Sequence, residues 1–381
     1  MTGAKQNPDV VVVGSGIVGL GAAFAAVRRG LRVVVVERGA APTGATIRNF
    51  GHLCIGAQGG EAQRYADASR ELWLQLARDA GFWLRESGTL VAARHEDELA
   101  VLSAAAQDGG IRMLEADELL RRAPLRRDGL VGGALIEADL QTNPRTAATT
   151  IVRYLTARGV EFRFRTAVTA LGAGRVETTR GAIDTGAVVV AVNHDIDQLL
   201  PEVAERHGVV RCALDMMLAA VSFPRPLTAP LLTGWSLIRY GRFAEGPEAR
   251  VLHERLHAER PDLAALDLNQ MYTQLPDGTL ILGDSHVTDA APSPFQPEAA
   301  FTAFLSEAEA LFEGAAPRVI ERWQGVYASG PGEFLVEEPE PGLHVIAATT
   351  GIGMTCGLGL AEHTLRTAID RAPQLIPEGA S

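Results

Sequence analysis

The chain has 381 residues, of which 47% are hydrophobic and 21% charged, and its formal net charge is −11. This length suits one large core or two closely packed domains, and the acidic balance argues against nucleic acid or an anionic membrane as a partner. The first eight residues contain one lysine and no apolar core, and no apolar run approaches the roughly 18 residues of a membrane span. We therefore expect no signal peptide, no membrane span and a cytoplasmic location.

Four successive features of residues 9–37 predict one kind of site. They are an apolar run at 10–13, the spacing Gly14-x-Gly16-x-x-Gly19, a small-residue helix over 21–29, and a second apolar run at 31–36. Gly14 permits a sharp turn, Gly16 lacks a Cβ that would meet a pyrophosphate, and Gly19 lets the helix pack closely on the sheet. Glu37 ends the second run, where a carboxylate can accept hydrogen bonds from the ribose hydroxyls of an adenosine. We expect a Rossmann-type dinucleotide site; the alternative is a glycine-rich turn without a ligand.

The remaining elements alternate between helix and strand patterns. Helices are predicted over 61–80, 96–107, 144–158, 301–312 and 358–372, with Asn143 and Pro144 starting the third and Pro373 stopping the last. Strands are predicted over 89–93, 130–137, 160–164, 167–171, 187–192, 217–222, 280–283, 318–327 and 343–348. Possible phosphate-cradling turns thus lie near both ends of the chain. This favours a discontinuous cofactor domain (1–85, 144–208 and 330–381) and a substrate domain inserted in two pieces (86–143 and 209–329).

The motifs resemble those of the D-amino-acid-oxidase-like flavoproteins, which include glycine oxidase and monomeric sarcosine oxidase. The resemblance covers nearly the whole chain and rests on the N-terminal glycines with Glu37, the segment 44–51, the strand 187–192 and the loop 350–355. Asn193 stands where a glycine is usual in the family. The resemblance implies an α/β protein with a Rossmann-type FAD-binding domain and an inserted antiparallel-sheet substrate domain of α+β type. Segments 48–51, 274–286 and 322–329 resemble a subgroup associated with the breakdown of small aminophosphonates.

The same resemblance implies which residues bind the cofactor. The C-terminal loop would present backbone N–H groups to the flavin, although an ordinary strand-to-helix connector is the alternative. Arg48 and Asn49 are candidates to approach the pyrophosphate or the flavin ring, and Val168 would meet the adenine through its backbone. The expected cofactor residues are Gly14, Gly16, Ile17, Val18, Gly19, Glu37, Arg38, Thr46, Arg48, Asn49, Phe50, Gly51, Val168, Asn193, Gly351, Ile352, Gly353, Met354 and Thr355.

The cysteines predict neither a metal site nor a flavin tether. Cys54, Cys212 and Cys356 are widely spaced and form no metal-ligand pattern. Some sarcosine oxidases attach FAD through a cysteine of the inserted domain, but Cys212 and Cys356 do not fall in that motif. We therefore expect FAD to be held without a covalent bond.

The segment Trp323-Gln-Gly-Val-Tyr327 departs from the family pattern. Amino-acid oxidases of the family have arginine at the position of Tyr327, and that arginine grips the substrate carboxylate. A phenol cannot neutralise a carboxylate, so an amine with a more distant anion fits better; alternatively, Arg239 or Arg322 replaces the missing arginine. For the anion, His286 is the first candidate, and a protonated His286 would lose its grip as pH rises past roughly 6.5.

The expected activity is oxidation of a small primary or secondary amine by hydride transfer to flavin N5, with oxygen or another electron acceptor. The candidate pocket residues are His52, Tyr327, His286 and Arg239, although His52 is equally explained as a buried histidine with satisfied hydrogen bonds. The first substrate candidate is 2-aminoethylphosphonate or its N-methyl derivative, which would give phosphonoacetaldehyde. The alternatives are an oxidase or dehydrogenase of sarcosine or glycine-like amino acids, and a flavoprotein subunit of a larger electron-transfer complex.

Overall fold

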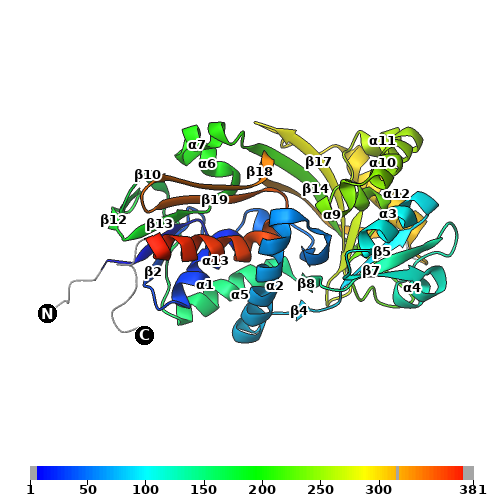
Figure 1. The fold of residues 1–381 in the computed structure, drawn as a ribbon, viewed down its shortest axis with the longest axis horizontal. Helices are drawn as coiled ribbons and strands as arrows, with labels where there is room; N and C mark the ends of the chain where they lie inside the picture. Colours follow the sequence, from blue (N-terminus) through cyan, green and yellow to red (C-terminus); the bar gives the residue numbers. More distant parts are fainter. Residues whose placement is uncertain (1–6, 315–316, 372–381) are drawn as a thin grey trace.

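A thirteen-stranded sheet extends through the molecule in the computed structural model, which describes residues 7–314 and 317–371 (Figure 1). The strand order is β6-β7-β5-β15-β16-β17-β14-β18-β19-β13-β1-β2-β9, and two smaller sheets have the orders β10-β11-β12 and β3-β8-β4. The strands are β1 (Val10–Val13), β2 (Val33–Val36), β3 (His52–Leu53), β4 (Leu84–Arg85), β5 (Thr89–Ala93), β6 (Ile111–Glu115), β7 (Gly132–Ile136), β8 (Leu140–Thr142), β9 (Glu161–Arg163), β10 (Val168–Gly172), β11 (Arg175–Thr178), β12 (Ile183–Asp184), β13 (Ala187–Val190), β14 (Val210–Ala220), β15 (Leu231–Leu232), β16 (Met271–Gln274), β17 (Leu280–Asp289), β18 (Arg318–Glu340) and β19 (Leu343–Thr350).

The helices cover this sheet along its length. They are α1 (Ile17–Val27), α2 (Gly60–Ala80), α3 (Glu96–Ala106), α4 (Ala116–Arg122), α5 (Pro144–Ala157), α6 (Ile196–Leu199), α7 (Pro201–Arg206), α8 (Gly234–Leu237), α9 (Gly241–Ala244), α10 (Pro247–Glu259), α11 (Pro261–Ala264), α12 (Glu298–Leu311) and α13 (Gly353–Arg371), with 3-10 turns η1 (Ala45–Ile47), η2 (Ile55–Ala57) and η3 (Asn193–Asp195). None of the described helices has the length and apolar character that a bilayer span requires.

The parallel part of the sheet explains the valine runs of the sequence. β19, β13, β1, β2 and β9 pair in parallel, in that order. Val10 and Val12 pack into the core beneath α1, α2, α5 and α13, whereas Val11 and Val13 face the opposite core, which includes Val176 and Ile183 of the small sheet. Because both faces of these strands are buried, hydrophobic residues occupy successive positions instead of alternating with polar ones.

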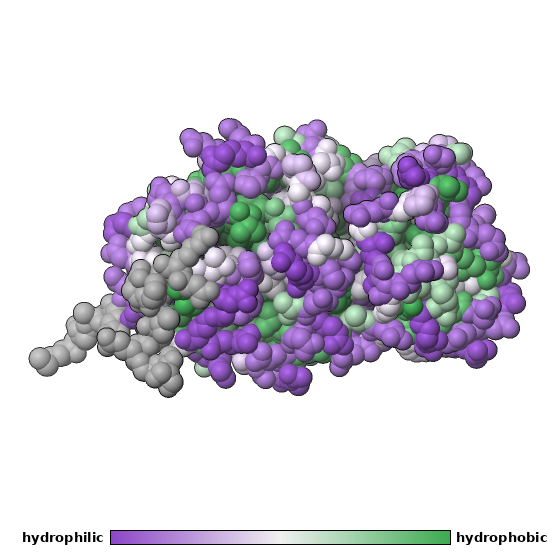
Figure 2. All heavy atoms as spheres, viewed as in Figure 1, coloured by the Kyte–Doolittle hydropathy of each residue, from purple (hydrophilic) through white to green (hydrophobic). Residues whose placement is uncertain are grey.

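The antiparallel part forms the other half of the molecule. β14 lies between β17 and β18 and pairs antiparallel with both. A separate core, which includes Leu90, Met216 and Phe301, packs the helices α3, α10 and α12 against these strands. On the face shown in Figure 2, hydrophilic residues predominate and apolar residues occur in small groups. The α/β architecture with a second, antiparallel portion confirms the expected fold class.

The observed elements differ from the predicted ones mainly where glycine is abundant. α1 begins at Ile17 instead of 21, and α13 begins at Gly353 instead of 358. The low helix propensity of glycine hid both starts, yet the glycines are there for close packing. A Cβ at Gly359 would lie 2.2 Å from the carbonyl oxygen of Tyr65 in α2. The predicted end of this helix at 372 and its stop at Pro373 lie outside the described residues.

The region 209–329 is richer in structure than the sequence pattern indicated. The four helices α8–α11 and strand β16 were not predicted, and β14 and β17 are longer than the strands expected there. β18 continues from Arg318 to Glu340, through the proposed domain boundary at 329/330, with a register shift between Ser329 and Phe334. The division into two domains stays a prediction.

Candidate functional site

A cavity of about 990 Å³ lies where the parallel and antiparallel parts of the sheet meet. Its walls come from the loops that follow β1 and β2, from η1 and η3, and from β14, β17, β18 and the β19–α13 turn. This volume is at the upper end of the range for small-molecule and cofactor pockets, about 300–1,000 Å³. The two ends of the chain and its middle therefore contribute to a single site.

The three N-terminal glycines have different roles. A Cβ at Gly14, where φ is +102°, would lie 2.5 Å from the carbonyl oxygen of Ala191, and a Cβ at Gly19 would lie 2.1 Å from that of Gly14. Both positions are therefore closed by the protein's own backbone. A Cβ at Gly16 would meet only the Thr46 hydroxyl, at 3.4 Å, and Gly16 lines the cavity. The room at Gly16 is the space into which a dinucleotide phosphate fits.

Glu37 is held in place at the end of β2. One carboxylate oxygen accepts hydrogen bonds from the Ser15 backbone N–H and hydroxyl, at 3.0 and 2.7 Å, and the other accepts from the Gly39 N–H at 2.7 Å. Arg38 pairs with Asp195 of η3 at 2.5 Å, across the same end of the cavity. The carboxylate that we expect to meet the adenosine ribose is thus fixed before any ligand binds.

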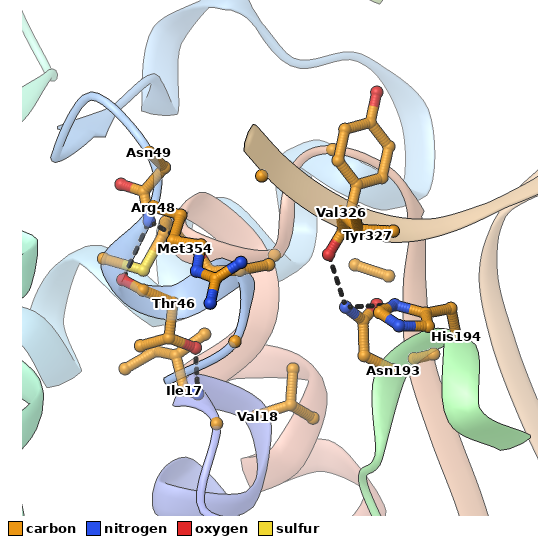
Figure 3. A pocket seen from close by; sticks show the side chains of 18 of the residues that line it. Ile17, Val18, Thr46, Arg48, Asn49, Asn193, His194, Val326, Tyr327 and Met354 are labelled. Atoms are coloured by element: carbon orange, nitrogen blue, oxygen red, sulfur yellow. Dashed lines mark hydrogen bonds between the residues drawn. The ribbon is translucent and has the colours of Figure 1, made fainter. Parts of the chain in front are cut away.

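The loop around η1 forms the wall next to the start of α1 (Figure 3). The Thr46 hydroxyl accepts from the Ile17 N–H at 2.8 Å, which holds η1 against that helix. The Asn49 amide donates to the carbonyls of Ala45 and Thr46, and its oxygen accepts from the Gly51 N–H. Arg48 donates to the Gln324 carbonyl at 3.1 Å. Thr46 and Asn49 therefore shape the loop with their side chains, while Arg48 links it to β18.

Asn193 occupies the end of β13 in a left-handed conformation. Its φ of +59° explains why glycine is usual at this position. Its side-chain oxygen accepts from the Ala328 N–H at 2.8 Å, and its amide donates to the Val326 carbonyl at 3.4 Å, so it connects the parallel part of the sheet to β18 (Figure 3). Val168, at the start of β10, lines the cavity from the small sheet.

The β19–α13 turn faces Tyr327. A Cβ at Gly351, where φ is +79°, would lie 3.1 Å from the Tyr327 ring, so the phenol packs directly on this loop. Ile352, Gly353, Met354 and Thr355 line the cavity at the N-terminal end of α13, where the helix dipole favours negative charge. Burial raises the pKa of Tyr327, which therefore keeps its proton and acts as a hydrogen-bond donor.

Charged residues gather on the wall opposite the glycine turns. Arg239 follows α8, and its Nη1 donates to the carboxylate and the carbonyl of Asp267, at 2.5 and 3.2 Å. His286 in β17 bonds through Nδ1 to the same carbonyl at 2.9 Å, so Nδ1 carries the proton. Burial lowers the pKa of His286, and the ring is therefore neutral at pH 7. This corrects the expectation of a protonated His286 and leaves Arg239 as the permanent cation on this wall.

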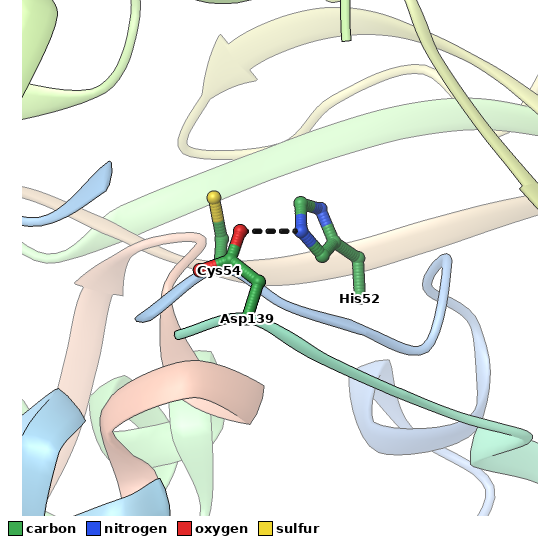
Figure 4. Close-up of side chains that lie close together, drawn as sticks. All are labelled: His52, Cys54 and Asp139. Carbon is green, nitrogen blue, oxygen red and sulfur yellow. Dashed lines mark hydrogen bonds and ion pairs between the residues drawn. The ribbon is translucent and has the colours of Figure 1, made fainter. Parts of the chain in front are cut away.

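His52 belongs to a buried group beneath the cavity (Figure 4). Its Nε2 lies 2.6 Å from the Thr89 hydroxyl and 3.1 Å from an Asp139 carboxylate oxygen, whose other oxygen accepts from the Gly56 N–H. Potential ligand atoms of His52, Cys54 and Asp139 lie within 4.8 Å of one another. Burial raises the pKa of Cys54 well above its usual value, which favours the thiol over the thiolate that binds metals. The hydrogen bonds account for His52 as a buried histidine at the edge of the pocket.

All the predicted site residues except Gly19 and Gly51 line the cavity. Gly51 instead packs against β8, where a Cβ would lie 2.0 Å from the carbonyl oxygen of Thr142. Sequence reasoning missed Asp284, Asn269 and Cys212, which also line the cavity. No local motif marks these three residues, and they are brought together by antiparallel pairing of distant strands.

The fold and the dinucleotide site define a class, and comparison with known proteins agrees with it. A family model described as FAD dependent oxidoreductase matches residues 9–366, so the chain belongs to this family. The expected FAD and the expected oxidoreductase class are thereby confirmed.

Individual relatives show how far the similarity extends. One of the subunits of opine oxidase from Rhizobium meliloti is 24% identical over 375 residues, which cover 92% of this chain and 91% of that protein. The match to one of the subunits of anaerobic glycerol-3-phosphate dehydrogenase from Escherichia coli (strain K12) is 36% identical over 113 residues, but it spans only 28% of this chain and 20% of that protein. The structure of glycine oxidase from Bacillus cereus ATCC 14579 superposes with a TM-score of 0.77 and 18% identity over 95% of both chains, which shows a shared fold.

Proposed function

We propose that the protein oxidises a small primary or secondary amine that carries an anionic group away from its nitrogen, with 2-aminoethylphosphonate or its N-methyl derivative as the first candidate. The observation that carries this proposal is the pairing of a neutral Tyr327 with a cationic Arg239 on the walls of one cavity. The phenol stands where amino-acid oxidases of the family have their carboxylate-binding arginine. A substrate anion would therefore bind at Arg239 instead.

The structure separates the two arginines that could replace the missing one. Arg239 uses Nη1 for Asp267, and among the described residues its Nε and Nη2 have no hydrogen-bond partner, so they are free to bind an anion. Arg322 makes two hydrogen bonds to Glu298, at 2.6 and 2.9 Å, and is not among the cavity-lining residues. Of the two, Arg239 is the better placed to meet a phosphonate.

FAD, when bound, supplies the two-electron oxidation by accepting a hydride from the carbon next to the nitrogen. We propose that Gly16 and the start of α1 hold its pyrophosphate, that Glu37 holds the adenosine ribose, and that the turn of Gly351 and Gly353 holds the flavin edge, without a covalent bond. The protein's own task is then to orient the amine and to exclude water from the cavity.

Replacing Arg239 tests the proposed substrate charge. We expect Arg239→Met to raise KM for 2-aminoethylphosphonate by at least about tenfold, because charge-assisted hydrogen bonds contribute roughly 1.5–3 kcal/mol. Activity with n-propylamine, which has no anion, should be little changed. Steady-state kinetics with both amines measures the difference.

Arg322→Met is the matched control, because its guanidinium pairs with Glu298 and does not line the cavity. It should leave both KM values unchanged. Equal losses with both amines in Arg239→Met, or a normal KM for the aminophosphonate, would show that Arg239 does not bind the anion.

A second candidate function is that of a flavoprotein subunit in a larger electron-transfer complex. The similarity to the opine oxidase chain along nine tenths of both proteins favours it, because that relative is itself one of several subunits. The two candidates differ in what the isolated chain can do. A catalytic chain bleaches its own flavin anaerobically when given an amine, whereas a chain that only relays electrons does not.

A further inference from the structure

Asp284 is a buried carboxylate whose hydrogen bonding is incomplete. Its side chain is 7% exposed and lines the cavity, and its Oδ1 has no hydrogen-bond partner among residues 7–314 and 317–371. An unpartnered buried carboxylate oxygen is costly, and such groups in folded proteins usually have a function. The position of Asp284 in the cavity wall indicates that a ligand completes its hydrogen bonding.

The neighbours of Asp284 do not neutralise it. His286 Nε2 lies 3.5 Å from Asp284 Oδ2, but Nδ1 carries the ring proton and burial keeps His286 neutral. Cys212, Tyr240 and Tyr327 also face the carboxylate, and burial raises the pKa of each, so all three are uncharged.

Two further groups favour a charged Asp284. The Asn269 side chain and the Arg239 cation both stabilise the ionised form, whereas burial raises the carboxyl pKa above its ordinary value. Arg239 makes its own hydrogen bonds to Asp267, not to Asp284. The wall therefore presents a committed cation with spare donors beside a carboxylate that has a spare acceptor. Such a pair matches a ligand with one anionic and one ammonium group.

We propose that Asp284 binds the substrate's amino group through Oδ1 and takes one proton from the ammonium, so that the nitrogen is neutral when the adjacent C–H reaches the flavin. The inference rests on the proposed function, because it assumes that the substrate is an amine. The step is a proton transfer alone: the N–H bond of the ammonium breaks, and an O–H bond forms on the carboxylate. Burial makes the carboxylate a stronger base than an exposed aspartate, which suits it to this transfer.

Ligand binding tests the first half of the proposal without turnover. 2-Amino-2-methylpropylphosphonate has an ammonium group but no hydrogen on the carbon that bears the nitrogen, and ethylphosphonate lacks the amine. We expect Asp284→Asn to raise the Kd of the former by at least about tenfold at pH 7 and to change that of the latter by less than about twofold. Both values come from the change in flavin absorption of the FAD-loaded enzyme on titration.

The pH profile of anaerobic flavin reduction tests the second half. Asp284→Asn should be slow at pH 7, and its rate should approach that of the wild type near about pH 10, where the free amine predominates without help. Asp284→Glu, which keeps a carboxylate, should restore part of the neutral-pH rate. An unchanged pH profile in Asp284→Asn would overturn the proton-transfer role.

Asp215→Asn is the control for burying an amide in place of a carboxylate. Asp215 is 5% exposed on the neighbouring strand, accepts from Gln296 and Ser285, and does not line the cavity. It should behave as the wild type in both experiments. Equal weakening of both phosphonates in Asp284→Asn would show that Asp284 only shapes the cavity and would overturn the inference. Failure of every amine to reduce the wild-type flavin would instead overturn the proposed function, and that result is independent of the binding comparison.

Discussion

The residue at position 327 sets the charge that the cavity offers beside the β19–α13 turn. Tyr327 packs on Gly351 and shares a hydrogen bond with Cys212, so the ring is held by both neighbouring strands. A neutral donor at this point can orient a substrate but cannot offset a carboxylate. The only permanent cation that we place on the opposite wall is Arg239, and this spacing favours a substrate whose anion and amine are apart.

Gly16 gives a prediction at the same scale. A valine there meets only the Thr46 hydroxyl within the protein, so the fold should tolerate it, but its side chain would occupy the space of the cofactor phosphate. We expect Gly16→Val to fold with normal circular dichroism and to retain less than about a tenth of the wild-type FAD. Flavin released by heat and measured per chain gives the ratio.

Gly172→Val is the matched control, because a Cβ at Gly172 has no neighbour within 4 Å and the residue does not line the cavity. It should keep one FAD per chain. Full FAD content in Gly16→Val would contradict the placement of the phosphate.

At the scale of elements, η3 joins the two parts of the sheet. Asn193 stands at its start, and its side chain bonds to the backbone of Val326 and Ala328 in β18. β13 carries the cofactor side and β18 carries Tyr327. Asn193 therefore fixes the flavin side of the cavity relative to the substrate side, a task that the glycine usual in the family cannot perform with a side chain.

Two substitutions separate the conformation of Asn193 from its hydrogen bonds. Asn193→Gly keeps the left-handed φ and loses only the side-chain bonds, at a cost of about 1–2 kcal/mol in the free energy of unfolding. Asn193→Ala also strains the backbone and should cost about 1–2 kcal/mol more. Urea unfolding of the FAD-loaded protein measures both. An alanine variant as stable as the glycine variant would show that the positive φ carries no cost.

The nucleotide end of the site was predictable because its signals are local. β1, β2 and the glycines between them lie within 30 residues, and buried parallel strands leave continuous valine runs. The substrate wall was not predictable in this way. Asp284 meets Asn269 through backbone pairing between two strand ends, and His52 meets Asp139 across 87 positions in the chain. The glycine-rich start of α13 was missed because helix propensity opposes it, while tight packing on α1 and α2 overrides that preference.

On the scale of the whole molecule, the continuous sheet brings one cavity to the junction of its parallel and antiparallel parts. The parallel part supplies the glycine turns at β1 and β19, and the antiparallel part supplies Arg239, Asp284 and Tyr327. A cofactor bound along the first part would present its reactive end to the second. The central claim is therefore that substrate charge, as well as flavin chemistry, decides what this chain oxidises.

The most direct test is anaerobic flavin reduction in the purified chain with a panel of amines. 2-Aminoethylphosphonate and its N-methyl derivative are compared with glycine, sarcosine and D-alanine, and the bleaching rate is recorded for each. The account predicts that an aminophosphonate reduces the flavin at least about tenfold faster than D-alanine, because the bidentate arginine–carboxylate pair is absent at Tyr327. Fastest reduction by D-alanine, glycine or sarcosine would contradict it.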